Sequence, residues 1–260
     1  MQSDFPSASQ NQLKKWAKLT DAKFRRADGL LFAEGVKVVE ELLKSDWEIE
    51  AILILPEKIR YWEELIEAVK NHHPVYQLTR SAWKKLSQDK ESEGLIAIVK
   101  NKKQLSFSEW LKSAMGHVLI GCQISNPQNL GALMRSAYWF GFENILLGCS
   151  SVDWTHPKVI RASMGAFFHL RILSNVDVAT VLSEIRRDYV LIGSDVHQGI
   201  APHPLTQRGA LLMGSESHGL PADLLEQASE RWCIPGNNLS DSLSLPQAAA
   251  IMMYEMNKKV

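Results

Sequence analysis

Three polar segments in the second half of the chain carry the side chains best suited to chemistry. They are "SNPQNLGALMR" at residues 125–135, "GSESHGLP" at residues 214–221 and "IPGNNLSDSLSLP" at residues 234–246. Each follows an apolar, strand-like run. Ligands in α/β sheets usually bind at loops that leave the carboxyl ends of parallel strands. We therefore expect these three segments to form one site.

The first segment contains Asn129, Gly131 and Arg135 in the spacing N-x-G-x-x-x-R. Asn129 is expected to cap a helix that starts near Gly131, which would put Arg135 on its first or second turn. A guanidinium at that end of a helix can bind a phosphate or a carboxylate. A helix cap followed by an ordinary surface arginine would produce the same pattern.

The second segment places Glu216 shortly after the apolar run "LLMG". A buried carboxylate is costly unless it is paired, and Arg135 is the expected partner. Gly214 would let the backbone approach a ligand closely, and we assign no catalytic role to His218. In the third segment, main-chain groups around Ile234 could hold an uncharged heterocycle such as adenine, although a polar turn before a helix looks the same.

Strand-like runs alternate with amphipathic helical patterns along the whole chain, which is typical of an α/β protein. Several runs lack polar alternation, as expected of parallel strands covered on both faces. The expected strands in the second half lie within residues 117–124, 144–150, 189–196, 210–216 and 231–236. Helices are expected at 131–140, 177–187 and 221–228, and at the C-terminus, where Pro246 suits a first turn. We predict domains at 1–103 and 117–260, joined by a linker at 104–116.

Composition gives no sign of a special partner, because Lys+Arg and Asp+Glu each number 29. No apolar run is long enough for a bilayer and the N-terminus lacks a signal-peptide pattern, so we expect a cytoplasmic protein without a membrane partner. The three cysteines have no metal-type spacing and are expected to be buried thiols; neither a metal site nor a disulfide is predicted. They are Cys122, Cys149 and Cys233.

Residues 11–26 are the most basic stretch of the chain and include Lys14, Lys15, Arg25 and Arg26. Lysines and arginines clustered in this way can contact RNA phosphates even where the net charge is zero. A solvated face is the alternative interpretation. The glycine-rich patterns of dinucleotide-binding and P-loop proteins are both missing, which argues against an open doubly wound nucleotide-binding enzyme.

Taken in order, N-x-G-x-x-x-R, G-S-E-x-x-G and I-P-G followed by S-L-x-L resemble the three motifs of the SpoU (TrmH-like) RNA 2'-O-ribose methyltransferases of the SPOUT superfamily. The segment "HPKVIRASMGAFFHL" also resembles that family, and the likeness covers residues 116–260. Residues 21–100 are similar to the ribosomal-protein-like α/β substrate-binding domain often fused in front of it.

The resemblance implies a homodimer that binds S-adenosylmethionine in a C-terminal trefoil knot around residues 211–220 and 232–246. It also implies an active site built from both subunits, with the apolar final helix at their interface. The cofactor-binding residues carried over are Gly214, Ile234 and Leu243, with Leu212 and Gly219 beside them.

The reaction implied is methyl transfer to a ribose 2'-hydroxyl in ribosomal or transfer RNA. Arg135 would orient or activate that hydroxyl together with the target's phosphate, since arginine stays protonated and cannot serve as a free base. Asn129 and Glu216 would hold Arg135, and Ser242 would complete the site. The RNA species and the proton acceptor stay open.

One position departs from the family pattern, which usually shows S-L-N where this chain has Ser242, Leu243 and Ser244. A hydroxyl stands in place of a side-chain amide and has a shorter reach, so we expect part of the hydrogen-bond network to survive or to be bridged by water. This departure favours the alternative function, a non-catalytic RNA-binding protein that retains the methyltransferase fold.

Overall fold

The computed structural model describes residues 5–89, 91–237 and 242–258. The chain forms two compact units. The N-terminal unit comprises Met1–Lys103 and Thr155–Phe168, and the C-terminal unit comprises Gln104–Trp154 and His169–Val260.

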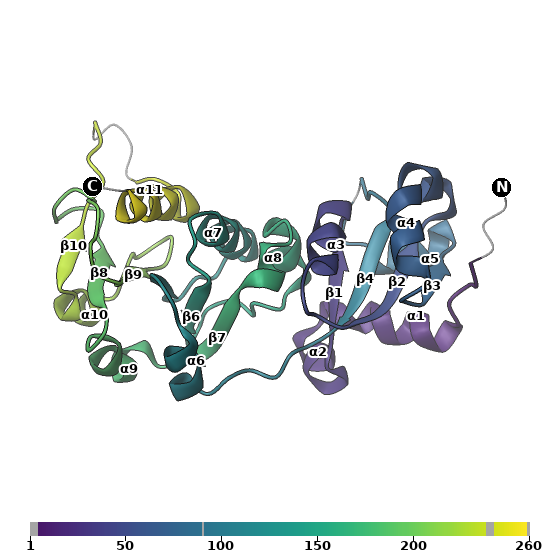
Figure 1. Ribbon diagram of the computed structural model, residues 1–260, viewed down its shortest axis with the longest axis horizontal. Helices are drawn as coiled ribbons and strands as arrows, with labels where there is room; N and C mark the ends of the chain where they lie inside the picture. The colour runs from purple at the N-terminus through teal and green to yellow at the C-terminus, as the bar shows by residue number, and fades with distance from the viewer. Residues whose placement is uncertain (1–4, 90, 238–241, 259–260) are drawn as a thin grey trace. The chain divides into compact units, whose positions relative to one another are not determined.

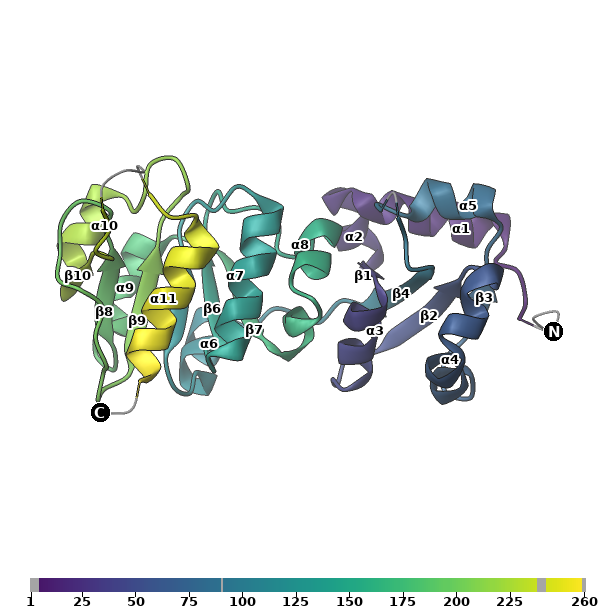
Figure 2. The ribbon, with the colours of Figure 1, turned by 90° about the horizontal axis from the view of Figure 1, so that it is seen from above.

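The N-terminal unit is built on a four-stranded sheet in the order β1-β4-β2-β3. Its strands are β1 (Leu30–Glu34), β2 (Ile49–Ile54), β3 (Val75–Gln77) and β4 (Leu95–Lys100). β4 runs antiparallel to both of its neighbours, whereas β3 is parallel to β2. The α-helices are α1 (Gln10–Ala17), α2 (Ala22–Asp28), α3 (Val36–Leu43), α4 (Glu63–Lys70) and α5 (Arg80–Leu86), with short 3-10 helices η1 (Lys18–Thr20) and η2 (Pro56–Tyr61). Figure 2 shows α1 and α5 on one face of this sheet and α3 and α4 on the other.

Residues 155–168 come from the second half of the chain but pack with the N-terminal unit. Their helix α8 (Pro157–Ala162) lies against the edge strand β1, and η3 (Ala166–His169) follows it. The indole Nε1 of Trp47 donates to the carbonyl oxygen of Phe168 at 3.0 Å. A division of the chain at residues 104–116 alone therefore does not describe its packing, and the expected domain limits remain a proposal.

The C-terminal unit contains six strands in the order β10-β8-β9-β5-β6-β7. Every neighbouring pair is parallel, as the unbroken apolar runs predict. The strands are β5 (Val118–Gly121), β6 (Asn144–Gly148), β7 (Arg171–Val176), β8 (Val190–Ser194), β9 (Gly209–Met213) and β10 (Glu230–Trp232). The sequence did not indicate β7, an edge strand in which only Ile172 and Leu173 are buried.

Helices cover both faces of this parallel sheet (Figure 1). One face packs against α6 (Phe107–Ser113), α9 (Val178–Ile185) and α10 (Ala222–Gln227), and the other against α7 (Pro127–Trp139) and α11 (Leu245–Asn257). Trp110 of α6 and Leu182 of α9 share a core with Ile120 and Leu212 of the central strands. The loops after β5, β9 and β10 therefore leave the same edge of the sheet, as expected for the three polar segments. None of the helices in the described ranges combines the length and apolar composition needed to span a membrane.

Candidate active site

The first polar loop leads into α7, which starts at Pro127 rather than near Gly131. Asn126, not Asn129, is its N-cap, because the Oδ1 of Asn126 accepts from the backbone N–H groups of Gln128 at 2.8 Å and Asn129 at 3.4 Å. Proline at the first helical position is favoured since its fixed φ suits a helix and its missing N–H needs no partner. The prediction that Asn129 caps this helix was therefore wrong. Its side chain is available for a contact elsewhere.

Asn129 joins the first loop to the second. Its Nδ2 donates to Oε1 of Glu216 at 2.9 Å. Glu216 is exposed, so its carboxylate does not carry the burial cost expected from its place after β9. The structure thus brings together two of the predicted catalytic residues, from segments 87 positions apart in the sequence.

Arg135 does not join this pair within one chain. It is exposed, and it forms no hydrogen bond or ion pair with any residue in the described ranges. Six residues beyond Asn129, it lies about 9 Å further along α7 and roughly 240° around the helix axis. The two side chains therefore point in different directions. The expected contacts of Asn129 and Glu216 with Arg135 do not form inside one chain.

The second loop closes tightly on itself. The backbone N–H of Ser215 donates to Gly219 at 2.9 Å, and the N–H of Gly219 donates back to Ser215 at 3.0 Å. A Cβ on Gly214 would lie 2.0 Å from the carbonyl carbon of Gly219, so only glycine fits there. Gly219 itself has a φ of +67°, a conformation that glycine adopts without strain. Gly214 is therefore needed for loop closure, which fixes the shape in which Glu216 is presented.

Leu212 supports this loop from below. It is fully buried. In the sheet it lies between its register partners, Ile120 of β5 and Gly193 of β8. Its side chain belongs to the core of the sheet, so a direct cofactor contact through that side chain is not available.

The third loop follows β10 and contains Ile234, which is half-buried. Residues 238–241 lie outside the described residues. Leu243 is 46% exposed, and Ser242 beside it is also exposed. Ser244 occupies the N-cap position of α11, and its Oγ donates to Oε1 of Gln247 at 3.0 Å. The Ser244 side chain accepts no backbone N–H of this helix, so its hydroxyl contacts Gln247 instead of capping α11.

The predicted RNA-contacting residues divide into two groups. Lys14, Lys15 and Arg26 are exposed and form no ion pair within the described part of the chain. Arg25 is only 2% exposed. Its Nη1 donates to the carbonyl oxygens of Leu19 at 2.9 Å and Thr20 at 3.0 Å, and its Nε donates to Oγ1 of Thr155 at 3.0 Å. Arg25 is therefore structural, which contradicts its predicted role as an RNA contact.

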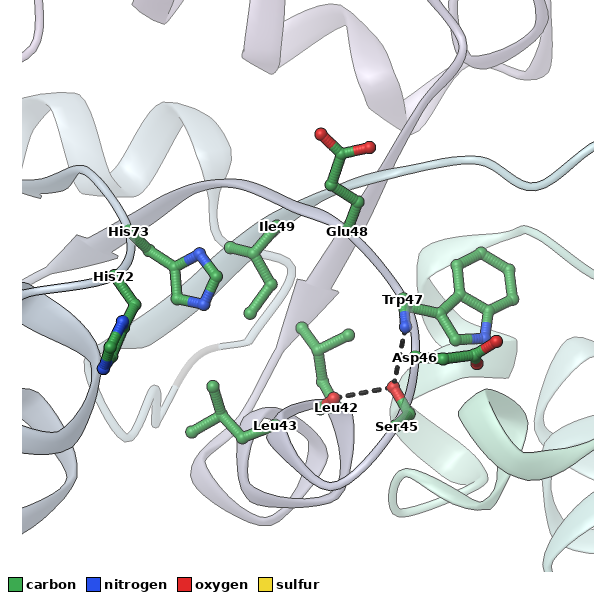
Figure 3. Close-up of a pocket in the computed structure, with 9 residues that line it drawn as sticks. All are labelled: Leu42, Leu43, Ser45, Asp46, Trp47, Glu48, Ile49, His72 and His73. Atoms are coloured by element: carbon green, nitrogen blue, oxygen red, sulfur yellow. Dashed lines mark hydrogen bonds between the residues drawn. The ribbon is translucent and has the colours of Figure 1, made fainter.

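A cavity of about 520 Å³ lies in the N-terminal unit between the end of α3, the start of β2 and the end of α4 (Figure 3). None of the predicted site residues lines it. Its two acids, Asp46 and Glu48, are ion-paired with Lys102 and Lys100. Figure 3 shows His73 beside Ile49, and burial lowers the pKa of this histidine. Nothing in this lining requires a ligand.

A second cavity of about 320 Å³ lies where β5 and β6 end, and Cys122 and Cys149 are among its lining residues. Burial raises the pKa of the Cys122 thiol to about 12, so it stays protonated and is no nucleophile. Cys149 is exposed and Cys233 half-buried, so the expectation of three buried thiols holds only for Cys122.

Known proteins resemble the chain over both units. The SpoU rRNA Methylase family model matches residues 116–254, more than half of the chain, and the MRM3-like substrate binding domain model matches residues 10–97. The 23S rRNA (guanosine(2553)-2'-O)-methyltransferase RlmP of Bacillus subtilis is 27% identical, over 96% of this chain and 97% of its own length.

Solved structures show the same fold. A crystal structure of an RNA 2'-O ribose methyltransferase is 29% identical with a TM-score of 0.82, and the match covers 96% of each chain. The SpoU methyltransferase AviRb from Streptomyces viridochromogenes, solved in complex with AdoMet, is 21% identical with a TM-score of 0.81 and coverage of 95% of this chain and 97% of its own.

Proposed function

Since the chain belongs to the SpoU rRNA methylase family, we propose that it transfers a methyl group from S-adenosylmethionine to a ribose 2'-hydroxyl of ribosomal or transfer RNA. The observation that carries this proposal is the contact between Asn129 and Glu216, which joins two of the three motif loops at the carboxyl edge of the parallel sheet. The relatives named above support RNA as the substrate.

The residues at this edge fit S-adenosylmethionine, which supplies an electrophilic methyl group on its sulfonium. The main chain of Gly214, Ile234 and Leu243 would hold its adenosine and methionine parts. Apolar side chains beside the third loop suit a heterocycle, because Val196 and Ile200 are about half exposed. Cys233 holds both residues beside this loop. Its Sγ donates to the carbonyl oxygen of Val196 at 3.3 Å, and its N–H donates to that of Ile200 at 2.9 Å.

Arg135 acts on the RNA by charge and position. Its guanidinium stays protonated, so it binds the phosphate next to the target ribose and holds the 2'-hydroxyl in line with the methyl group. The proton of the 2'-hydroxyl passes to phosphate or water. The fixed positive charge of Arg135 stabilises the negative charge that develops on the 2'-oxygen. Asn129 and Glu216 keep the first two loops in register, and Ser242 borders the site.

The exposed face of α7 and α11 supports a homodimer. It carries Trp139 at 83% exposure, Tyr254 at 52% and Ile251 at 39%, and an edge contact between Phe140 and Tyr254 joins the two helices. Apolar surface of this kind is unusual on a monomer. Arg135 lies one turn before Trp139, on the same face of α7. A second copy docked there brings Arg135 of one protomer toward the loops of its partner.

The exposed cations of α1 and α2 supply RNA contacts. Lys14, Lys15 and Arg26 form what we call the basic patch; they are exposed and unpaired within the described residues. Some exposed lysines of this unit are neutralised, as Lys100 is by Glu48. Others are exposed without an ion pair in the described residues, namely Lys23, Lys84 and Lys85. Unpaired cations on a substrate-binding unit favour phosphate binding. Family membership also supports a cytoplasmic enzyme whose C-terminal segment forms a trefoil knot.

The deciding experiment is transfer of labelled methyl from S-adenosylmethionine to total RNA from cells lacking the gene, followed by digestion and identification of the labelled nucleoside. A 2'-O-methylated nucleoside is expected, and mapping it names the RNA. Labelling on a base, or on protein alone, would contradict the proposed reaction.

A non-catalytic RNA-binding protein is the second candidate, because Ser244 stands where the family usually has asparagine. The same assay with Ser244→Asn separates the two. If the wild-type protein binds cofactor but labels neither ribosomal subunits nor transfer RNA, and Ser244→Asn labels one of them, the second candidate is correct for the natural chain.

The role of Arg135 gives the first mutational prediction. Arg135→Ala should abolish methyl transfer while the dissociation constant for S-adenosylhomocysteine, measured by calorimetry, changes less than about twofold, because the guanidinium acts on RNA. Gln128→Ala, an exposed change on the same helix, is the control and should leave both quantities unchanged. Loss of cofactor binding in Arg135→Ala would mean that the arginine is structural.

A further inference from the structure

The loop at residues 195–208, between β8 and β9, runs along the outer edge of β10. The N–H of Ile200 donates to the carbonyl oxygen of Arg231 at 2.9 Å, and the N–H of Cys233 donates to the carbonyl oxygen of Ile200 at 2.9 Å. Gly199 has a φ of +146°, and a Cβ there would lie 2.4 Å from the carbonyl oxygen of Arg231. β10 has only three residues and one neighbouring strand, so this loop supplies the other half of its support.

His203 ties the loop to β10 through a side chain. Its Nδ1 lies 3.0 Å from the carbonyl oxygen of Pro204, and its Nε2 lies 2.9 Å from Oε2 of Glu230 on β10. The indole Nε1 of Trp232 donates to the same carboxylate oxygen at 2.8 Å. A carbonyl oxygen only accepts hydrogen bonds, and so does an ionised carboxylate. Both nitrogens of His203 must therefore carry a proton for both contacts to form, which makes the ring an imidazolium.

The charges around His203 favour this protonated form. The Pro204 carbonyl raises the pKa of His203, and the Glu230 carboxylate raises it further, whereas partial burial acts in the opposite direction. Most of the other charged groups nearby have partners of their own. On the loop, Asp195 accepts from the N–H groups of His197 and Gln198. α11 meets the loop where the N–H of Leu205 donates to Met256. Arg208 pairs with Asp188, and Glu255 pairs with Lys258. The remaining charged group is Arg231 on β10.

We propose that His203 is a positioning residue for the cofactor site: its imidazolium holds the 195–208 loop on β10 and so fixes the main chain at Cys233 and Ile234. The inference rests on the proposed function, which assigns that main chain to S-adenosylmethionine. His203 need not touch the cofactor. Its effect travels through Glu230 and Trp232, the residues of β10 that lead directly into Cys233.

This arrangement makes cofactor affinity depend on pH. Below the pKa of His203, both ring N–H groups are present and the loop is held. The raised pKa extends that range upward from the ordinary value for histidine. As pH rises through the folded-state pKa, one N–H is lost, its contact breaks and the end of β10 loosens. Cofactor binding should therefore weaken on the alkaline side.

The test measures S-adenosylhomocysteine binding by calorimetry between pH 6.0 and 8.5. His203→Ala should bind about tenfold more weakly than the wild type at pH 6.0, since a charge-assisted hydrogen bond is lost, and its affinity should change less with pH. His203→Lys keeps a positive charge and should restore most of the affinity across the range. His197→Ala, an exposed histidine of the same loop, is the matched control. Ionisation of the ligand affects all four proteins equally.

A readout without ligand comes from the proton resonances of His203, followed by nuclear magnetic resonance during a pH titration of the free protein. Glu230→Gln should lower the pKa of His203, because a neutral amide replaces the carboxylate. An unchanged titration in that variant would contradict the tie between His203 and Glu230.

The outcomes separate the two proposals. If the wild type binds S-adenosylhomocysteine and His203→Ala binds it equally well at every pH, the inference is wrong and the proposed function stands. If His203→Ala and His203→Lys are weakened alike while both stay folded, charge is not the cause and the inference is again wrong. If the wild type does not bind S-adenosylhomocysteine at any pH, the proposed function is wrong, and the role of His203 at a cofactor site falls with it.

Discussion

Gly214 and Gly236 lie in two loops of the candidate site and differ in what a methyl group would meet. At Gly214 a Cβ would overlap the backbone of Gly219 and Leu220, at 2.0 and 2.1 Å, whereas at Gly236 it would meet nothing within 4 Å. Backbone cannot move aside as the end of a flexible side chain can. The two positions therefore distinguish a glycine required by loop closure from one that is not.

Gly214→Ala should lower the free energy of unfolding by about 2 kcal/mol and weaken S-adenosylhomocysteine binding, because the overlap must open the second loop. Thermal unfolding and calorimetry check the two effects. Gly236→Ala is the matched control for stability and should leave the free energy of unfolding unchanged. Equal behaviour of the two variants would show that the 214–219 turn is not closed in solution.

Side-chain roles in the site were only partly predictable from the sequence. The types at Asn129 and Glu216 indicated a polar site, and the structure joins them. Their expected partner, Arg135, does not join them within one chain, because it lies six residues beyond Asn129 on α7 and faces another direction. Arg25 was misassigned since its acceptors are two backbone carbonyls and Thr155, a residue 130 positions away. No local pattern reports a partner so distant in sequence.

Elements were more predictable than side chains. Each expected strand of the second half occurs, because buried parallel strands need continuous apolar runs. β7 was missed since an edge strand keeps polar residues such as Ser174 and Asn175. The grouping of residues 155–168 with the N-terminal unit was also not predictable, because it depends on tertiary contacts such as that of Trp47 with Phe168.

His117 links the two central strands of the parallel sheet and makes that link dependent on pH. The N–H of Gly209 donates to Nδ1 of His117 at 2.8 Å, so Nδ1 carries no proton and the ring is neutral. The ring stacks on Phe142 with centroids 5.3 Å apart, and burial lowers the pKa of His117. Protonation in the folded state would break the contact with Gly209 at the start of β9.

The free energy of unfolding should therefore fall as pH drops below about 6.5, where the unfolded chain takes up a proton that folded His117 resists. The loss should continue down to the lowered folded-state pKa. Urea unfolding at pH 7.5 and 5.5 measures it. His117→Asn keeps an acceptor but cannot titrate, so it should lose less stability than the wild type. His218→Asn, an exposed change, should behave like the wild type.

At the scale of the whole molecule, the exposed cations of the N-terminal unit should set the salt dependence of RNA binding. Replacing Lys14, Lys15 and Arg26 with alanine should weaken binding to the identified RNA and reduce the slope of log affinity against log salt by up to about 3. Filter binding at several salt concentrations measures this slope. Replacing Lys100 and Lys102, which are already paired, is the control. An equal slope in the two variants would remove the basic patch from the RNA interface.

Dimerisation through α7 and α11 would explain why Arg135 is exposed and turned away from Glu216. Trp139→Glu places a charge in the apolar face and should give a monomer in analytical ultracentrifugation, without methyl transfer. Tyr61→Glu, at an exposed aromatic residue of the N-terminal unit, is the control and should stay dimeric and active. A Trp139→Glu protein that remains dimeric would mean that another surface forms the dimer.

A mixed dimer decides whether Arg135 serves its own chain or its partner. Arg135→Ala and Glu216→Ala should each be inactive as homodimers. If Arg135 of one protomer acts beside Glu216 of the other, a heterodimer of the two variants has one site that lacks both residues and one intact site. Because a two-fold dimer has two equivalent sites, this heterodimer, purified through two different tags, should show about half of the wild-type methyl transfer. If each arginine serves its own chain, both sites of the heterodimer lack one residue and no activity returns. The about 240° turn of α7 between Asn129 and Arg135 favours the first outcome.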